Sequence, residues 1–231
     1  MRPNAKRWVF LFEPYFDIFI KYIMKLLILT QKIDKNDPVL GFFHHWVEEF
    51  AKHCEKITVI CLQKGEHNLP HNVKILSLGK EDKVSRFEYL RRFYKYIRDE
   101  KENYDSVLVH MNQEYILLGS IAWKTWGKKI YMWRNHHAGN FLTDISAYFC
   151  DNVFCTSKFS FTAKYKKTIF MPVGIDTNIF KQDGSVERKR GSILFLSRIS
   201  PIKKPHILIE VLRDLKDTGI DFTASFYGDP G

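Results

Sequence analysis

Motifs that mark several common protein classes are missing from this sequence. It has no CxxC pair, and none of its four cysteines stands near a histidine at the spacing of a structural zinc site. It also lacks a GxSxG elbow, a GxxxxGK[ST] loop and an HExxH pair, the usual signatures of serine hydrolases, P-loop proteins and zinc proteases. We therefore expect no structural metal, and reduced thiols as in a cytoplasmic protein. The cysteines are Cys54, Cys61, Cys150 and Cys155.

Long hydrophobic runs are missing as well. Residues 1–23 are rich in apolar and aromatic side chains, but Glu13, Pro14, Asp17 and Lys21 interrupt them. A membrane-spanning helix needs roughly 18 or more consecutive apolar residues, and a signal peptide carries no charges inside its apolar region. The sequence predicts neither. Because Met24 opens a strongly strand-like run, residues 1–23 are either an extension upstream of the true start or an interfacial anchor.

Acidic residues are fewer than basic ones, 26 against 36, so the net charge is +10. A surplus of this size suits an anionic partner, such as nucleic acid, an acidic membrane or a phosphorylated substrate. The basic residues are spread along the chain and do not alternate with aromatic residues in one short motif. The sequence therefore predicts no binding of nucleic acid and leaves peripheral contact with an anionic membrane open.

What the sequence does contain is a regular alternation of short β-branched runs and longer helical patterns. This order predicts an α/β fold, a Rossmann-like doubly wound parallel sheet, over residues 24–180. Helices are expected at Gly41–His53 and Val84–Lys101. The predicted inward-facing residues of the first helix are Phe42, Trp46 and Phe50, with Phe43 and Val47 assigned to that side more weakly. Those of the second are Phe87, Leu90, Tyr94 and Ile97. The expected strands are Lys25–Thr30, Lys56–Leu62, Val73–Leu78, Asp105–His110, Lys129–Arg134, Asn152–Thr156 and Thr168–Met171.

A polar, charged stretch at residues 181–191 interrupts this alternation and is predicted to be an interdomain linker. The alternation restarts over residues 192–231, with strands at Ser192–Ser197 and Asp221–Tyr227 and a helix at Pro201–Lys216 between them. Ser200 is expected to cap this helix. Two strands and one helix are too few for a closed core, so we expect the truncated start of a second Rossmann-like domain.

Ligands of parallel α/β sheets bind beyond the carboxyl ends of the strands. Arg198 and Lys203 follow the strand at Ser192–Ser197 and lie beside an expected helix N-terminus. Free backbone amides favour anions at such a position, and arginine and lysine would complete a receptor for a diphosphate. On spacing alone, solvated loop charges are the favoured explanation of both residues.

Three segments, in this order, resemble signature segments of glycosyltransferase family 4: PVGIDTNIF at 172–180, ILFLSRISPIKKPHILIEVL at 193–212, and FYGDPG at 226–231. The run that starts at Met24 is similar to bacterial members of the family too. The resemblance implies a GT-B fold of two Rossmann-like domains, in which Arg198 and Lys203 hold the diphosphate of a nucleotide sugar. It also implies that Gly41 lets the backbone approach the donor phosphate. Ser197 departs from the family pattern, in which a glycine usually precedes the arginine.

The segment from Arg134 to His137 ends the strand at Lys129–Arg134. By resemblance, His136 takes the place of the family's catalytic cleft histidine, with His137 as the alternative. Without the resemblance, a histidine at a strand end is more often a packing or capping residue. Arg134, His110 and Ser157 are expected to face the acceptor, although Ser157 is explained equally well as the N-cap of a following helix. His44 and His45 lie in a helical pattern and are interpreted as structural.

The resemblance implies a retaining hexosyltransferase that moves a sugar from a nucleotide-diphosphate sugar to a glycan or lipid-linked acceptor in an interdomain cleft. No Asp-x-Asp pair is present to chelate a metal on the donor, so we expect metal-independent transfer, with Arg198 and Lys203 stabilising the departing diphosphate, and no cofactor. The family's paired glutamates would lie beyond residue 231, so the fragment itself is expected to be inactive. The alternative is a non-catalytic half-domain that binds an acceptor or a membrane surface. The expected location is the cytoplasm, with the inner face of the membrane as a peripheral site.

Overall fold

A computed structural model describes residues 24–177, 179–187 and 189–229 of the chain. Residues 1–23, for which the sequence left two interpretations, lie outside the described part. The chain divides into two compact units, and the division falls between Phe180 and Lys181. Each unit is described by itself.

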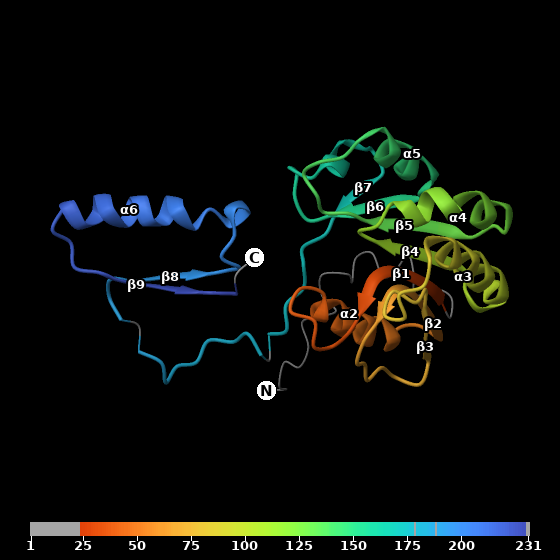
Figure 1. Cartoon of the computed structure of the whole chain (residues 1–231), viewed down its shortest axis with the longest axis horizontal. Helices are drawn as coiled ribbons and strands as arrows, with labels where there is room; N and C mark the ends of the chain where they lie inside the picture. The colour runs from red at the N-terminus through yellow and green to blue at the C-terminus, as the bar shows by residue number, and fades with distance from the viewer. Residues whose placement is uncertain (1–23, 178, 188, 230–231) are drawn as a thin grey trace, which may run out of the picture. The chain divides into compact units, whose positions relative to one another are not determined.

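The first unit is built on a seven-stranded sheet in which every strand pair is parallel (Figure 1). The strand order is β3-β2-β1-β4-β5-β6-β7, so β1 lies near the centre of the sheet. The central strands are almost continuous apolar runs because helices cover both of their faces. The strands are β1 (Lys25–Ile33), β2 (Lys56–Lys64), β3 (Val73–Ser77), β4 (Ser106–His110), β5 (Lys129–Trp133), β6 (Asn152–Cys155) and β7 (Thr168–Phe170).

Helices lie on both faces of this sheet, which confirms the doubly wound α/β fold (Figure 1). Helix α2 (Gly41–Ala51) packs on the face that carries Leu26 and Ile28 of β1. The opposite face, with Leu27 and Leu29, is covered by three helices. These helices are α3 (Arg86–Asp99), α4 (Glu114–Thr125) and α5 (Phe141–Phe149). Two short 3-10 helices, η2 (Lys101–Asn103) and η3 (Phe161–Lys164), lie in the connections.

The predicted inward faces of two helices are partly wrong. In α2 the fully buried apolar positions are Phe43 and Val47, which the sequence assigned to the inward side only weakly, whereas Phe42 is half exposed. In α3 the ring of Phe93 packs between α4 residues, with centroids 5.8 Å from Tyr115 and 6.2 Å from Trp123. This packing turns the Phe93 side of α3 toward the core, and it leaves three of the four predicted inward residues at least partly in solvent. These three are Phe87, Leu90 and Tyr94.

The second unit consists of two parallel strands, β8 (Ser192–Leu196) and β9 (Thr223–Tyr227), joined by helix α6 (Pro205–Asp217). The predicted helix start at Pro201 is wrong. A single 3-10 turn, η4 (Pro201–Lys203), is followed by Lys204 in the left-handed conformation at φ 52°, and α6 begins only at Pro205. A residue that precedes proline is disfavoured in the α conformation, so Lys204 cannot continue one helix from Pro201. Accordingly, the side chain of Ser200 makes no capping hydrogen bond.

Candidate functional site

The strand order reverses between β1 and β4, and ligands of open α/β sheets bind at the carboxyl ends of strands at such a switch point. The hydroxyl of Thr30 and Nδ1 of His110 lie 3.1 Å apart at this point, and both side chains are buried. Sequence reasoning selected His110 because it ends its strand. It missed Thr30, which no motif marks and which only the pairing of β1 with β4 brings to His110.

His110 is held in an aromatic cage beneath the carboxyl edge of the sheet. Its ring stacks on Phe43 with centroids 4.0 Å apart and an interplanar angle of 11°, and Phe42 and Trp46 lie near its edges at 6.1 Å. Burial lowers the pKa of His110 to about 4, because desolvation disfavours the charged imidazolium. The imidazole is therefore neutral at neutral pH and is enclosed by the core.

The guanidinium of Arg134 links the turns that follow β4 and β5. Nη2 donates to the carbonyl of Ala138 at 3.0 Å, and Nη1 lies 3.4 Å from the carbonyl of Met111. Met111 has a φ of 68°, which is uncommon for a residue with a side chain and turns the chain sharply after His110. Among the described residues, Nε of Arg134 is buried without a hydrogen-bond partner. Arg134 thus holds the two loops together at the carboxyl edge of the sheet.

The loop after β5 presents two histidines to solvent. The rings of His136 and His137 stack with centroids 4.6 Å apart, and both residues are exposed. A backbone hydrogen bond fixes this loop, because the amide of Phe161 donates to the carbonyl of His136 at 2.9 Å. Asn135, to which sequence reasoning gave no role, accepts from the Ser160 hydroxyl at 2.7 Å. The exposed pair therefore stands on an anchored loop.

Ser157 does not begin a helix, so the alternative interpretation as an N-cap is wrong. Its hydroxyl accepts from the amide of Phe159 at 3.1 Å and its carbonyl from the amide of Ser160 at 3.0 Å, which makes a turn. The next helical segment, η3, starts only at Phe161. The backbone at Ser160 is extended, and its hydroxyl bonds to Asn135 instead of capping η3.

Gly41 is the first residue of α2 and lies at its buried N-terminus rather than in the loop before it. A Cβ at this position would lie 3.1 Å from the carbonyl oxygen of Lys35, so the loop after β1 approaches the helix closely. Asp37 fixes this loop by accepting from the amides of Val39 and Leu40 at 2.9 and 2.7 Å. The hydrogen bond from Lys32 lowers the pKa of Asp37 to about 2. Gly41 thus belongs to a tightly held turn at the carboxyl end of β1.

In the second unit, Arg198 and Lys203 lie on the loop that follows β8. Both are exposed, and neither forms an ion pair with another described residue. The amide of Ile199 donates to the carbonyl of Asp229 at 2.9 Å, so the loops after β8 and β9 are joined. Gly228 makes this approach possible, since a Cβ there would lie 1.8 Å from the carbonyl oxygen of Ser197. The two cations therefore project from a loop whose backbone is fixed.

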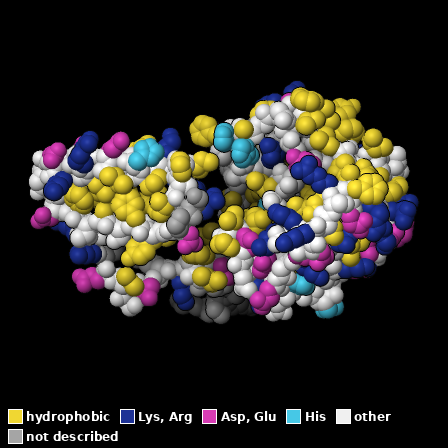
Figure 2. Space-filling model, in the orientation of Figure 1, with side chains coloured by type: hydrophobic (Ala, Val, Ile, Leu, Met, Phe, Trp, Pro, Cys, Tyr) yellow, Lys and Arg dark blue, Asp and Glu magenta, His cyan; other side chains and the backbone are white. Residues whose placement is uncertain are grey.

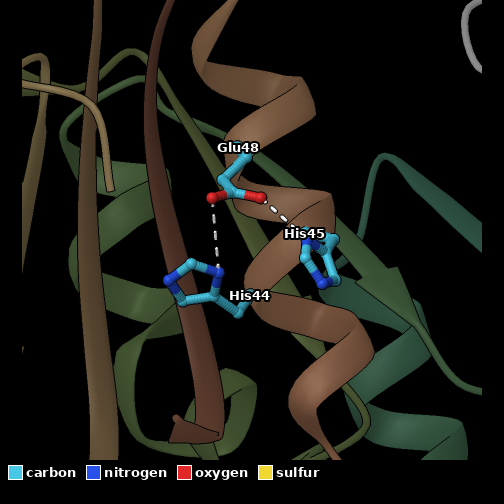
Figure 3. Close-up of side chains that lie close together, drawn as sticks. All are labelled: His44, His45 and Glu48. Atoms are coloured by element: carbon cyan, nitrogen blue, oxygen red, sulfur yellow. Dashed lines mark hydrogen bonds and ion pairs between the residues drawn. The ribbon is translucent and has the colours of Figure 1, made fainter. Parts of the chain in front are cut away.

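Among the described residues, one group of three potential metal ligands lies close together: His44, His45 and Glu48 on α2 (Figure 3). Nδ1 of His45 is 2.8 Å and Nδ1 of His44 is 3.6 Å from the Glu48 carboxylate. Nε2 of the buried His44 accepts a hydrogen bond from the amide of Asn68 at 3.1 Å. A neutral imidazole has one free lone pair, so Nδ1 of His44 carries the proton and has none for a metal. The geometry supports a structural hydrogen-bond network that ties α2 to the loop between β2 and β3.

Together, the seven-stranded sheet, the loops at its carboxyl edge and the β8-α6-β9 unit define a Rossmann-like α/β protein of the GT-B type. The chain belongs to the family described as glycosyl transferase 4-like, whose sequence profile matches residues 37–156. This confirms the resemblance to glycosyltransferase family 4. No curated protein matches the chain.

Solved structures of low sequence identity share this fold. A glycosyltransferase from Rickettsia africae has a TM-score of 0.58 at 15% identity, and the match covers 90% of this chain and 61% of that one. MurG from Acinetobacter baumannii has a TM-score of 0.51 at 9% identity, with 87% and 60% covered. The UDP-GlcNAc 2-epimerase from Methanocaldococcus jannaschii has a TM-score of 0.50 at 12% identity, with 89% and 66% covered. The chain thus spans about two thirds or less of each of these structures, and at these identities the likeness shows the fold alone.

Proposed function

We propose that the full-length protein transfers a sugar from a nucleotide-diphosphate sugar to a glycan or lipid-linked acceptor, with retention and without a metal ion. The observation that supports this most directly is the loop after β8, where Arg198 and Lys203 are exposed and free of carboxylates among the described residues. In this proposal the bond between the sugar C1 and the diphosphate oxygen breaks, and C1 bonds to a hydroxyl oxygen of the acceptor, which loses its proton. The negative charge that develops on the departing diphosphate is stabilised by the two cations.

The first unit would bind the acceptor and contact the transferred sugar. His136 and His137 are exposed on the anchored loop after β5, so they are our candidates for hydrogen bonds to the reacting groups. Arg134 would act as a positioning residue, because its guanidinium bonds to the carbonyls that shape this loop. His110 would position the switch point through Thr30 and not touch substrate, because it is buried and neutral.

The proposal places the protein in the cytoplasm, where the four buried, unpaired cysteines would stay reduced. In the described part of the chain, no helix is both long and apolar enough to cross a membrane. The proposed partners are the nucleotide sugar and its acceptor, without nucleic acid and without a bound cofactor.

The donor site can be tested by calorimetric titration of the full-length protein with UDP in the presence of EDTA. Arg198→Ala and Lys203→Ala should each weaken binding by roughly ten- to a hundredfold, because a lost charge-assisted contact costs about 1.5–3 kcal/mol. Lys216→Ala, in the last turn of α6, is the matched control and should change affinity little. Equal losses in all three variants, or binding that requires a divalent ion, would contradict the proposed site.

A second candidate, sugar epimerisation, arises because an epimerase shares the fold at a TM-score of 0.50. The two reactions differ in their products. An epimerase converts its nucleotide sugar without an acceptor, whereas a transferase releases the nucleoside diphosphate only as the acceptor is consumed. If the donor sugar is isomerised in an assay without acceptor, the protein is an epimerase and the proposed transferase function is wrong.

A further inference from the structure

The outer face of α5 is apolar although it lies in solvent. Phe141, Ile145 and Tyr148 follow one another at helical spacing and are 69%, 41% and 79% exposed. The inner face, with Ser146 and Ala147, is buried in the first unit. Figure 2 shows hydrophobic side chains gathered over the part of the surface that α5 occupies in Figure 1. An exposed stripe of large apolar side chains marks an interaction surface.

A lysine-bearing segment runs alongside α5. The ring of Phe161 packs against Gly139, just before α5. Nζ of Lys164 lies 2.7 Å from the carboxylate of Asp144, which is in the middle of α5. Near the C-terminal end of the helix, Nζ of Lys167 donates to the carbonyl of Tyr148 at 3.0 Å. The lysine-bearing segment from Phe161 to Lys167 therefore lies beside the apolar stripe along the length of α5. Two further lysines of this chain, Lys158 and Lys166, are exposed and have no ion pair among the described residues.

The charge of this region is strongly one-sided. Residues 115–175 contain eight lysines and arginines but only two acidic residues, Asp144 and Asp151. Lys164 neutralises the first, and Lys124 neutralises the second at 2.9 Å. Lys129 also lies 3.6 Å from the Asp151 carboxylate. The other basic side chains of this stretch have no acidic partner among the described residues, so they suit an anionic partner.

We propose that this α5 face, made of Phe141, Ile145 and Tyr148 with Lys158 and Lys166, docks on an anionic lipid bilayer. A bilayer interface accepts exposed aromatic and aliphatic side chains without requiring a matched shape, while anionic headgroups attract the flanking lysines. The loop that carries His136 and His137 leads directly into α5, so docking holds this loop close to the membrane surface. The inference rests on the proposed function in one respect: a lipid-linked acceptor would be reached from this surface.

Sedimentation of the protein with lipid vesicles tests this proposal. The full-length protein should bind vesicles of phosphatidylglycerol and phosphatidylethanolamine, and bind phosphatidylcholine vesicles at least about tenfold more weakly. The double variant Phe141→Ser with Tyr148→Ser should reduce binding to the anionic vesicles by about tenfold or more. Lys158→Glu and Lys166→Glu should each reduce it by roughly fivefold or more.

Matched controls separate the α5 face from general stickiness and basicity. Phe87→Ser removes an equally exposed aromatic ring, 76% exposed on α3, and Lys80→Glu reverses an exposed charge elsewhere in the same unit. Both should bind vesicles as the unmodified protein does, and unchanged thermal unfolding should show that all variants are folded. If the α5 and lysine variants bind vesicles as well as the unmodified protein does, the proposal is overturned, because another segment then attaches the protein to the membrane. Absent binding, or equal binding to neutral vesicles, overturns it too. UDP binding measured on the same variants reports on the donor site separately.

Discussion

His110 illustrates how surroundings decide the role of a titratable side chain. A histidine at the end of a strand near a switch point is a reasonable candidate for contact with substrate. Here Phe43 stacks on it and Thr30 bonds to Nδ1, so its ring belongs to the core. Exposed His136 and His137, only one strand away in the sheet, are the better candidates for chemistry.

The low pKa of His110 predicts acid sensitivity of the first unit. The folded-state pKa of about 4 lies below the ordinary value of 6.5, so the unfolded state binds more protons between these two pH values. The stabilisation is complete above about pH 6.5 and is lost as the pH falls toward 4, by on the order of 3 kcal/mol. His110→Gln, which stays neutral and can still bond to Thr30, should therefore flatten the pH dependence of the free energy of unfolding. Urea unfolding between pH 7 and pH 4.5 measures this.

His137→Gln is the control for this experiment, because His137 is exposed and should leave the pH dependence unchanged. Burial also lowers the pKa of His44, so part of the dependence will remain in His110→Gln. A His110→Gln protein that loses stability with acid as steeply as the unmodified protein would contradict the assigned burial of His110.

At the scale of elements, the loop before α6 shows how one proline resets a helix start. The ring of Pro205 crowds the right-handed α conformation of Lys204, so the turn at Pro201 cannot run on into α6, and Lys204 lies instead at φ 52°. The consequence is a break between η4 and α6, and Lys203 projects from the 3-10 turn. The sequence pair Ser200 and Pro201 resembles a helix start, yet the second proline, four residues later, determines where α6 begins.

Pro205→Ala should remove this break. With the clash gone, Lys204 should leave the left-handed region, which costs roughly 1–2 kcal/mol for a residue with a Cβ, and the helix should extend back toward Pro201. Backbone chemical shifts of Ile202, Lys203 and Lys204 would report the change. Pro201→Ala is the matched control and should leave the helix start at residue 205. Unchanged left-handed shifts for Lys204 in Pro205→Ala would show that Pro205 does not set the boundary.

At the scale of the molecule, the two units differ in how well they bury their apolar residues. In the first unit, β1 has Leu27, Ile28 and Leu29 with no exposed surface. In the second unit, no described residue of β8 or β9 is fully buried, and Leu196 of β8 is 73% exposed. Two strands and one helix cannot enclose a core on both faces.

Hydrogen exchange should separate the units in the 231-residue chain. Amides of β8 and β9 should exchange at least about tenfold faster than those of β1, because few buried contacts must open to expose them. The edge strand β7 is the internal control, since it also has a free edge but belongs to the larger sheet. Equal protection of β1, β8 and β9 would show that the second unit is closed on its own.

Much of the fold could be read from the sequence, because hydrophobic periodicity and strand-like composition act locally. All seven strands of the large sheet lie where they were predicted, with the largest difference at β1, which extends three residues beyond Thr30 to Ile33. The inward faces of the helices were less predictable. In α3 two apolar stripes compete, and contact with Tyr115 and Trp123 decides for Phe93.

The candidate site divides in the same way between sequence and tertiary structure. The sequence by itself determined the class of fold, the family and the placement of Arg198, Lys203, His136 and His137 after strands, because strand ends and motifs are local features of the chain. Only the tertiary structure decided that His110 is enclosed with Thr30, that Gly228 joins the loops after β8 and β9, and that the outer face of α5 stays uncovered. Each of these depends on contacts between residues far apart in the sequence, or on their absence, and no local pattern encodes which surfaces the folded chain will bury.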